Sequence, residues 1–244
     1  MRALVVVPTY EERSNLGPLV QAILLQGPGV EVLVVDDASP DGTGELADKL
    51  AERDARVHVI HRPAKRGLGT AYLEGFRYAL EESDAEVVIQ MDADFSHDPA
   101  ELGKMLEAVR GCDLAVGSRY RDGIRLLNWP LWRLLFSVLA NLYAAAVTGV
   151  PVRDLTSGFK CFRREALARL PLEQVRGDGY AFQIETTVHA WRLGMRVREV
   201  PIVFTDRLDG HSKLSNGIVW EAAWIVWWLR FARPWSRRRG GGAS

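Results

Sequence analysis

The stretch Val87-Val88-Ile89-Gln90-Met91-Asp92-Ala93-Asp94 decides the fold that we predict for this chain. Its first residues are apolar and mostly β-branched, which is typical of a strand buried inside a sheet. Two carboxylates follow, one residue apart, where that strand should end. Because ligands of open α/β sheets bind outside the carboxyl ends of the strands, we expect a cation and an anionic ligand at this point.

Asp92 and Asp94 are the first candidate ligands of a metal ion. Carboxylate oxygens suit Mg²⁺ or Mn²⁺, which bind a few protein carboxylates together with phosphate oxygens of a substrate. The alternative is an Asp-rich turn that leads into a helix, because Asp98-Pro99 has the pattern of a helix N-cap followed by the first helical residue. The spacing of the aspartates leaves both interpretations open, and the rest of the chain favours the metal site.

The first half of the chain repeats a pattern of apolar strand, polar loop and amphipathic helix. The predicted strands cover residues 3–7, 31–35, 57–60, 87–91 and 114–116, and the predicted helices cover residues 16–24, 44–53, 70–82 and 99–110. Strands that alternate with helices through short loops specify an α/β fold with a doubly wound, mostly parallel sheet. The polar loops then share one edge of that sheet.

The sequence lacks two common nucleotide-binding fingerprints. The loop after the first strand is Pro8-Thr9-Tyr10-Glu11 instead of G-x-G-x-x-G, and no G-x-x-x-x-G-K-[ST] occurs. Gly67-Leu68-Gly69 follows the third strand without the rest of either fingerprint, so we interpret it as a plain loop. Cys112 and Cys161 show neither metal-site spacing nor a disulfide framework, which indicates core positions and a reducing compartment.

Charge is distributed unevenly along the chain, although the net charge is +0. Residues 1–118 contain 21 acidic and 11 basic residues, a difference of −10, and residues 119–244 contain 10 acidic and 20 basic residues, a difference of +10. All eight tryptophans lie after residue 128. A basic, tryptophan-rich half suits an anionic partner, either a nucleic acid or a membrane surface.

The second half contains a long apolar stretch, residues 126–147, with Pro130 near its start and Arg133 a turn later. We predict a helix that lies in the headgroup region of a membrane instead of spanning it, because an arginine can reach the aqueous surface from there. A helix packed on the sheet is the alternative. The apolar run at the N-terminus is too short for a signal peptide.

The chain is predicted to divide into a main domain, residues 1–215, and a C-terminal helix with a flexible tail, residues 216–244. Further strands are expected at 159–162 and 197–204, and further helices at 164–170 and 182–193. Aromatic residues mark one face of the C-terminal helix: Trp220, Trp224, Trp227, Trp228 and Phe231. Tryptophan favours the membrane–water boundary and the arginines that follow attract anionic lipids, so we predict a surface anchor. A helix that covers a soluble core or meets a membrane-embedded partner subunit is the alternative.

Polar residues of both halves are expected to meet at the sheet edge. The first half supplies Tyr10, Glu12, Asp37, Asp92 and Asp94, and later loops supply Arg119, Arg207 and Lys213. Carboxylates with a divalent ion can hold a nucleotide diphosphate, and arginines can hold a second phosphate opposite it. Such a site suits group transfer from a nucleotide donor, with the ion as a Lewis acid for the departing diphosphate.

Five blocks of the sequence resemble the signatures of polyprenyl-phosphate (dolichol-phosphate) mannose synthases. They are Val6-Val7-Pro8-Thr9-Tyr10-Glu11-Glu12-Arg13-Ser14-Asn15-Leu16, Val34-Val35-Asp36-Asp37-Ala38-Ser39-Pro40-Asp41-Gly42-Thr43, Asp92-Ala93-Asp94-Phe95-Ser96-His97-Asp98-Pro99, Gly117-Ser118-Arg119-Tyr120 and Asp154-Leu155-Thr156-Ser157-Gly158-Phe159. The blocks follow the order of that family from residue 4 to about residue 213. The resemblance implies a GT-A-fold glycosyltransferase that moves mannose from GDP-mannose to a polyprenyl (dolichyl-type) monophosphate, as a peripheral protein at the cytoplasmic face of a membrane.

The resemblance also implies roles for individual residues. Guanosine and ribose would contact Pro8, Tyr10, Glu12, Val35 and Asp37. Asp92 and Ala93 would lie along the diphosphate, and Asp94 would ligate Mg²⁺ or Mn²⁺. Donor and acceptor phosphates would be held by Arg119, Arg207 and Lys213, with Arg133 meeting the lipid phosphate. Some relatives carry Gln as a further metal ligand where this chain has Ser96, so either Ser96 or a water or substrate oxygen fills that position.

A lipid monophosphate is already anionic at neutral pH, so it needs no strong general base. We therefore expect in-line attack at the anomeric carbon with inversion, and we expect Asp92, Asp94, Arg119 and Arg133 to be the catalytic residues. Two alternatives stay open: UDP-sugar-dependent transfer of glucose or N-acetylglucosamine to polyprenyl phosphate, and a non-catalytic membrane-associated subunit that binds nucleotide sugars. The absence of Gln-x-x-Arg-Trp disfavours processive polysaccharide synthases, and no nucleic acid partner is expected.

Overall fold

The computed structural model describes residues 1–124, 126, 127, 129–205 and 216–231 of the chain. Within this part, the main sheet has the strand order β3-β2-β1-β4-β7-β5-β8. The strands are β1 (Ala3–Thr9), β2 (Val30–Asp36), β3 (Val57–His61), β4 (Val87–Gln90), β5 (Leu114–Ser118), β7 (Lys160–Arg163) and β8 (Val197–Pro201). β7 is antiparallel to both of its neighbours, and the other neighbours in this sheet are parallel to each other. The predicted α/β fold with a mostly parallel sheet is confirmed.

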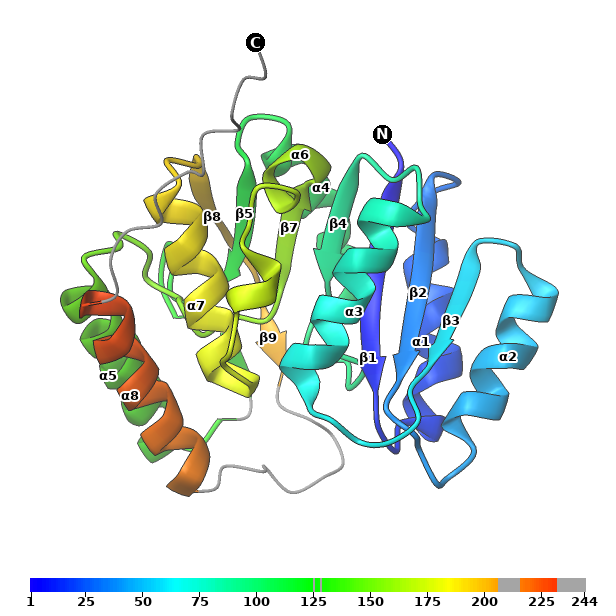
Figure 1. The fold of residues 1–244 in the computed structure, drawn as a ribbon, viewed down its shortest axis with the longest axis horizontal. Helices are drawn as coiled ribbons and strands as arrows, with labels where there is room; N and C mark the ends of the chain where they lie inside the picture. The colour runs from blue at the N-terminus through cyan, green and yellow to red at the C-terminus, as the bar shows by residue number, and fades with distance from the viewer. Residues whose placement is uncertain (125, 128, 206–215, 232–244) are drawn as a thin grey trace, which may run out of the picture.

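Helices cover both faces of the sheet (Figure 1). One face packs against α1 (Arg13–Leu24), α2 (Thr43–Arg53) and α4 (Leu102–Val109), and the other against α3 (Leu68–Glu81), α6 (Arg164–Leu167) and α7 (Gly179–Arg192). Short 3₁₀ turns lie at η1 (Pro99–Glu101) and η2 (Leu172–Gln174). Because both faces are covered, strands such as β1 are buried along their whole length, which explains their continuous apolar runs.

The prediction of one continuous strand over residues 197–204 is wrong, because the chain leaves the main sheet partway through this segment. β8 ends at Pro201, and residues Phe204–Thr205 form β9, which pairs with β6 (Leu126–Leu127) in a separate two-stranded sheet. In the main sheet β8 has β5 as its neighbour, and β5 ends at Ser118. The backbone of Ile202 donates a last hydrogen bond to the Ser118 carbonyl, and in the part of the chain that the structure describes no strand of the main sheet continues beside β8 beyond it.

The predicted apolar helices of the second half form a pair at one end of the molecule. α5 (Leu131–Thr148) and α8 (Asn216–Phe231) lie side by side, at the opposite end from α2 (Figure 1). Ile225, Val226 and Leu229 of α8 pack into a core shared with α5 and α7. Of the predicted aromatic face, Trp224, Trp227 and Phe231 are exposed, and Trp228 is half-buried against this core. The side chain of Trp220 lies outside the part that the structure describes.

α5 also meets the length and composition that a membrane-spanning helix needs, with 17% of its apolar window buried. Residues 134–152 contain no charged residue, so charge does not argue against a span over that run. The predicted helix is confirmed from Leu131 onward, whereas the first residues of the predicted stretch, Leu126–Leu127, form β6. The exposed side chains of α5 show that it does not pack on the sheet in the way that a core helix does. The division of the chain at residue 215 stays a prediction.

Candidate active site

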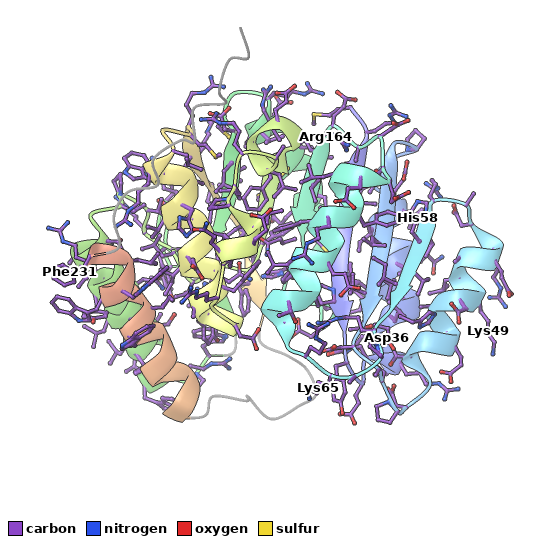
Figure 2. All side chains as sticks on the ribbon, viewed as in Figure 1. Asp36, Lys49, His58, Lys65, Arg164 and Phe231 are labelled. Atoms are coloured by element: carbon purple, nitrogen blue, oxygen red, sulfur yellow. The ribbon has the colours of Figure 1, made fainter. Side chains whose placement is uncertain are left out.

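A cleft of about 730 Å³ lies at the carboxyl ends of β1, β2 and β4. This is the edge at which the sequence places its polar loops, and Figure 2 shows Asp36 and Lys65 at that end of the sheet. The volume falls within the range of pockets that hold small ligands and cofactors. The parallel strands gather the loops here because each of them runs in the same direction.

Most of the predicted site residues line this cleft. They are Pro8, Tyr10, Glu12, Asp37, Asp92, Ala93, Asp94, Ser96, Arg119 and Arg133. Val35 does not line it, because its side chain is buried in the core between the sheet and α3. Arg207 and Lys213 lie outside the described residues.

The loops that follow β1, β2 and β4 are held in strained conformations. Each contains one non-glycine residue with a positive φ: Glu11 at 61°, Ala38 at 57° and Phe95 at 59°. Such backbone conformations persist only where the surrounding structure over-determines them, and they cluster at functional sites. The three loops therefore present their side chains to the cleft in fixed positions.

The two aspartates at the end of β2 differ in what they contact. Asp36 accepts hydrogen bonds from the Thr9 hydroxyl at 3.0 Å and from the Ser39 hydroxyl at 2.6 Å, so it fastens the β1 and β2 loops to each other. Asp37 accepts from the backbone N–H groups of Arg66 and Gly67 at 3.0 Å and from Nη1 of the buried Arg62 at 2.6 Å. Asp37 thus holds the loop after β3 against the cleft.

That loop was predicted to be plain, and the structure shows why it carries glycines. A Cβ atom at Gly69 would lie 2.7 Å from the carbonyl oxygen of Gly177, and Gly67 has a φ of +99°. The glycines let the loop approach the segment before α7, where the Gly69 N–H donates to Asp178 at 2.6 Å. The same loop brings the Lys65 ammonium to 3.5 Å from the centroid of the Tyr10 ring, at the cleft wall.

Asp92 is held by two residues from outside the strand. The hydroxyl of Tyr72, a fully buried residue of α3, donates to Oδ1 of Asp92 at 2.8 Å. Burial and the neighbouring Asp92 carboxylate raise the pKa of Tyr72, so the hydroxyl keeps the proton that it donates. The Asp92 backbone N–H donates to Nδ1 of His97 at 3.1 Å.

His97 is a neutral structural histidine in this arrangement. Burial lowers the pKa of His97, and because Nδ1 accepts a hydrogen bond, the ring proton lies on Nε2. The ring stacks on Phe159, with centroids 5.1 Å apart, and meets Phe204 edge-on. His97 thereby packs the turn that carries Asp92 and Asp94 against Phe159, which directly precedes β7, and against β9.

The donor set at the cleft fits a hard divalent cation that shares its coordination with a substrate. Asp92 and Asp94 bring carboxylates, and the Ser96 N–H orients Asp94 by donating to Oδ1 at 3.0 Å. In the described ranges no group of three or more His, Cys, Asp or Glu side chains could hold a metal by itself. Mg²⁺ commonly binds through one or two carboxylates plus phosphate oxygens, so this set suits a metal–nucleotide complex.

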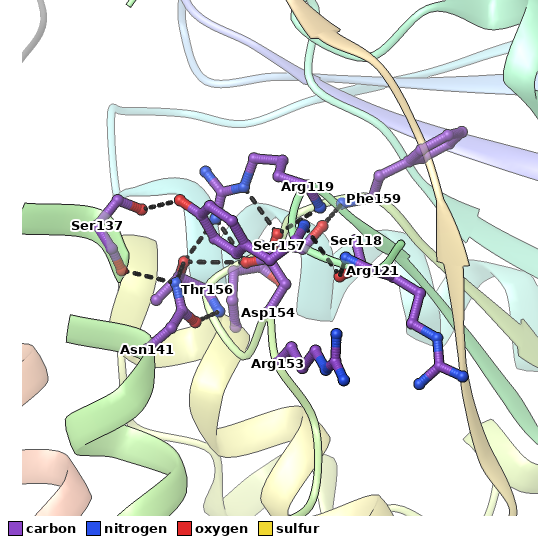
Figure 3. A network of polar contacts seen from close by, with 12 residues as sticks. Ser118, Arg119, Arg121, Ser137, Asn141, Arg153, Asp154, Thr156, Ser157 and Phe159 are labelled. Atoms are coloured by element: carbon purple, nitrogen blue, oxygen red, sulfur yellow. Dashed lines mark hydrogen bonds and ion pairs between the residues drawn. The ribbon is translucent and has the colours of Figure 1, made fainter. Parts of the chain in front are cut away.

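Arg119 lies opposite these carboxylates in a buried ion pair. Its Nε and Nη2 donate to the two oxygens of Asp154 at 2.7 and 2.6 Å, and Nη2 also donates to Thr156 at 2.7 Å (Figure 3). Burial would lower the pKa of Arg119, but the Asp154 carboxylate outweighs that effect and raises it, so the guanidinium stays charged. Nη1 donates to none of the residues that the structure describes.

The same network fastens α5 to the cleft. Asn141, a buried residue of α5, donates to the Thr156 hydroxyl at 3.1 Å and accepts from the Thr156 N–H at 3.2 Å. The Tyr120 hydroxyl donates to Ser137 of α5 at 2.7 Å. Figure 3 shows these contacts joining the loop of Asp154 and Thr156 to the helix. Arg133, at the start of α5, is therefore kept beside Arg119.

The ring of Trp129 is close to both arginines of the cleft. The Arg133 guanidinium carbon is 4.2 Å from the Trp129 ring centroid, and that of Arg119 is 5.7 Å away. Contacts of this kind orient a cation over an aromatic face. Two guanidinium groups thus share one wall of the cleft, which makes this wall suitable for phosphate.

Several residues of the site have no role in the sequence-based prediction: Tyr72, His97, Asp154, Thr156 and Gln183. Tyr72 and Gln183 lie on helices among apolar residues. A polar side chain at such a position is the one sequence feature that could have pointed to them. His97, Asp154 and Thr156 belong to the signature blocks, but their contacts depend on the fold.

The comparisons with known proteins identify the family. A model described as Glycosyl transferase family 2 matches residues 4–170. A polyprenol monophosphomannose synthase from Mycolicibacterium smegmatis is 48% identical over 233 residues, covering 94% of this chain and 88% of that protein. An undecaprenyl-phosphate mannosyltransferase from Micrococcus luteus is 45% identical over 240 residues, covering 98% of each.

A solved structure gives the same answer at the level of the fold. Glucosyl-3-phosphoglycerate synthase from Mycobacterium tuberculosis, in complex with Mn²⁺, uridine diphosphate and phosphoglyceric acid, has a TM-score of 0.69 at 20% identity. The match covers 94% of this chain and 78% of that one. The expected GT-A-type α/β fold is confirmed. Because the family model and the two relatives match most of its length, the chain belongs to glycosyl transferase family 2.

Proposed function

We propose that this protein transfers mannose from GDP-mannose to a polyprenyl monophosphate, with inversion at the anomeric carbon. One observation carries the proposal: Asp92 and Asp94 share a cleft with the charged Arg119 and Arg133, and the cleft reaches the exposed apolar helix α5. The names of the two curated relatives support a polyprenyl phosphate acceptor and mannose as the transferred sugar.

The carboxylate side of the cleft is the proposed donor site. Pro8, Tyr10, Glu12 and Asp37 line the part where guanosine and ribose would lie. Asp94 would hold Mg²⁺ or Mn²⁺ together with diphosphate oxygens, and the bound ion would supply Lewis-acid stabilisation of the leaving diphosphate. The Mn²⁺ in the structural relative supports a divalent ion in this fold.

The arginine side is the proposed acceptor site. Nη1 of Arg119 is the guanidinium nitrogen that Asp154 and Thr156 leave for a phosphate. Arg133 lines the same cleft, and its guanidinium carbon lies 4.2 Å from the ring centroid of Trp129, which Arg119 also approaches. An acceptor phosphate held here carries its own negative charge and attacks the anomeric carbon directly, so the protein contributes position and charge stabilisation instead of a general base.

The apolar face of α5 and α8 is the proposed membrane contact. Trp132 is 65% exposed, Leu139 63% and Trp224 64%, and the exposed aliphatic and aromatic side chains recur along one side of both helices. An exposed apolar surface of this kind marks an interaction site. Trp132 and Arg133 line the cleft as well, so a polyprenyl chain can leave the arginines along α5 into the cytoplasmic leaflet.

The function is tested with radiolabelled GDP-mannose and a short polyprenyl phosphate, with and without EDTA. We expect an organic-extractable mannolipid that EDTA suppresses. UDP-glucose and UDP-N-acetylglucosamine, assayed in parallel, address the alternative donors. Product from a UDP-sugar alone would replace the proposed donor, and nucleotide-sugar binding without any product would favour the non-catalytic subunit.

Tyr72→Phe should lower the rate of transfer about tenfold, because Asp92 loses the hydrogen bond that orients its carboxylate. The stability should change by about 1 kcal/mol, the usual net value of one hydrogen bond. Tyr78→Phe is the matched control: it removes the same group from the same helix, and the Tyr78 hydroxyl bonds to none of the described residues. Equal rates for the two variants would contradict the positioning role of Tyr72.

Leu139→Glu and Trp224→Glu should each weaken binding to anionic vesicles about tenfold or more, since each removes a large apolar side chain from the lipid-facing surface. Vesicle co-sedimentation measures the effect. Leu25→Glu, at a leucine after α1 that is more exposed than Leu139, should bind like the wild type. Unchanged vesicle binding by both helix variants would favour a membrane-embedded partner subunit as the occupant of this face.

A further inference from the structure

Three polar side chains converge on one point of the cleft wall, beside Gly158. A Cβ atom at this residue would lie 3.3 Å from Cε1 of His97, 3.4 Å from Oδ2 of Asp92 and 3.5 Å from Nε2 of Gln183. All four residues line the cleft. Because glycine has no side chain, the wall is open at a point that a small polar group of a ligand can occupy.

Gln183 brings a hydrogen-bond donor to this point. The residue is 3% exposed, and its Oε1 accepts from Nε2 of Gln90 at 3.4 Å. The Nε2 group donates to no residue in the described part of the chain. Gln183 lines the cleft, and its Nε2 lies 3.5 Å from the position of a Cβ atom at Gly158, so this amide can donate to an acceptor on a ligand that occupies that point.

Asp92 brings an acceptor to the same point. Tyr72 occupies its Oδ1, whereas its Oδ2 lies 4.0 Å from the nearest His97 nitrogen and accepts no hydrogen bond from the residues that the structure describes. The Asp92 side chain is 26% exposed, which leaves Oδ2 open to the cleft.

The backbone at Gln183 is held firmly. The ammonium of Lys160 donates to the Gln183 carbonyl at 2.6 Å and to the Thr186 hydroxyl at 2.9 Å, and the Thr187 hydroxyl donates to the same carbonyl at 3.0 Å. Lys160 is fully buried on β7. This turn of α7 is therefore fixed to the sheet, and the Gln183 amide has a fixed position in the cleft wall.

We infer that Gly158, Asp92 and Gln183 form a subsite for one hydroxyl group of the hexose, with Gln183 as a specificity-determining residue. A hydroxyl group both donates and accepts, so a single one can donate to Oδ2 of Asp92 and accept from Nε2 of Gln183. A fully ionised phosphate has no proton to donate to Asp92, so a phosphate group suits this point less well than a hydroxyl group does. The inference rests on the proposed function, since it concerns the sugar of the same donor, and it assigns Asp92 to the sugar while leaving Asp94 for the metal.

The test uses two variants that act on the subsite in different ways. Gln183→Met keeps the length of the side chain and removes the donor. Gly158→Ala fills the open point with a methyl group that its neighbours accommodate by shifts of a few tenths of an ångström, and Gly158 has no positive φ to forbid alanine. Gly103→Ala, where nothing lies within 4 Å of the new methyl group, is the matched control.

Calorimetry in Mn²⁺ measures the affinities of GDP, GDP-mannose and GDP-mannose analogues that each lack one hydroxyl. We expect both variants to bind GDP within about twofold of the wild type and to bind GDP-mannose about tenfold more weakly. The wild type should bind one deoxy analogue about tenfold more weakly than it binds GDP-mannose. Gln183→Met should bind that analogue and GDP-mannose with equal affinity. Gly103→Ala should match the wild type throughout.

Wild-type ratios of GDP-mannose to GDP affinity in both variants would overturn the inference and leave the proposed function intact. Failure of the wild type itself to bind or use GDP-mannose would contradict the proposed function, and the inference with it. If Gln183→Met does not fold because Gln90 loses its acceptor, Gly158→Ala decides the question alone.

Discussion

Asp94→Ala should abolish metal-dependent transfer, with a loss of at least about a thousandfold, which corresponds to about 4 kcal/mol of transition-state stabilisation. The reason is electrostatic. Asp94 is the cleft carboxylate assigned to the metal, and without the ion the leaving diphosphate keeps its full negative charge at the moment of bond cleavage. Initial rates over a range of Mg²⁺ and Mn²⁺ concentrations measure the effect, together with Mn²⁺ binding by electron paramagnetic resonance.

The control for this variant is Asp98→Asn, four residues further along the chain. Asp98 is exposed and accepts the Ala100 N–H at the start of η1, and asparagine keeps that cap while it removes the charge. The transfer rate of Asp98→Asn should stay within about twofold of the wild-type rate, because substitutions of exposed residues away from the site usually have small effects. Near-normal transfer by Asp94→Ala would refute the assignment of the metal site.

Asp154→Ala should destabilise the folded protein by about 3–5 kcal/mol, because it leaves the Arg119 guanidinium buried without its counter-charge. The Asp154 side chain is fully buried and that of Arg119 is 5% exposed, so water cannot replace the lost carboxylate. Denaturant unfolding measures the change. Asp84→Ala, which breaks an exposed ion pair with Arg2, should cost less than about 1 kcal/mol.

The double variant Arg119→Met/Asp154→Leu separates stability from catalysis. Removing both charges should recover most of the stability that Asp154→Ala loses, because no unpaired buried ion remains. Transfer should stay at background, since Nη1 of Arg119 is then missing from the acceptor site. A double variant as unstable as Asp154→Ala would show that the loss comes from packing around the pair and not from the unpaired charge.

The strands and helices of the first half could be predicted because their signals are local. β1, β2 and β4 are buried on both faces and show continuous apolar runs, and the helices between them show the 3.6-residue period. The break between β8 and β9 could not be predicted, because it depends on where the neighbouring strand β5 ends. Likewise, the apolar pattern of α8 does not say which of its tryptophans face α5 and α7.

The candidate site divides in the same way. The sequence by itself determined that carboxylates follow β2 and β4, and parallel strands then bring those residues to one edge. Only the tertiary structure decided which side chains hold them. Tyr72 is 20 residues from Asp92, Arg119 is 35 from Asp154, and Gln90 is 93 from Gln183. No period or spacing links such residues, because their contacts arise where separate strands and helices pack against each other, and that packing is a property of the whole fold.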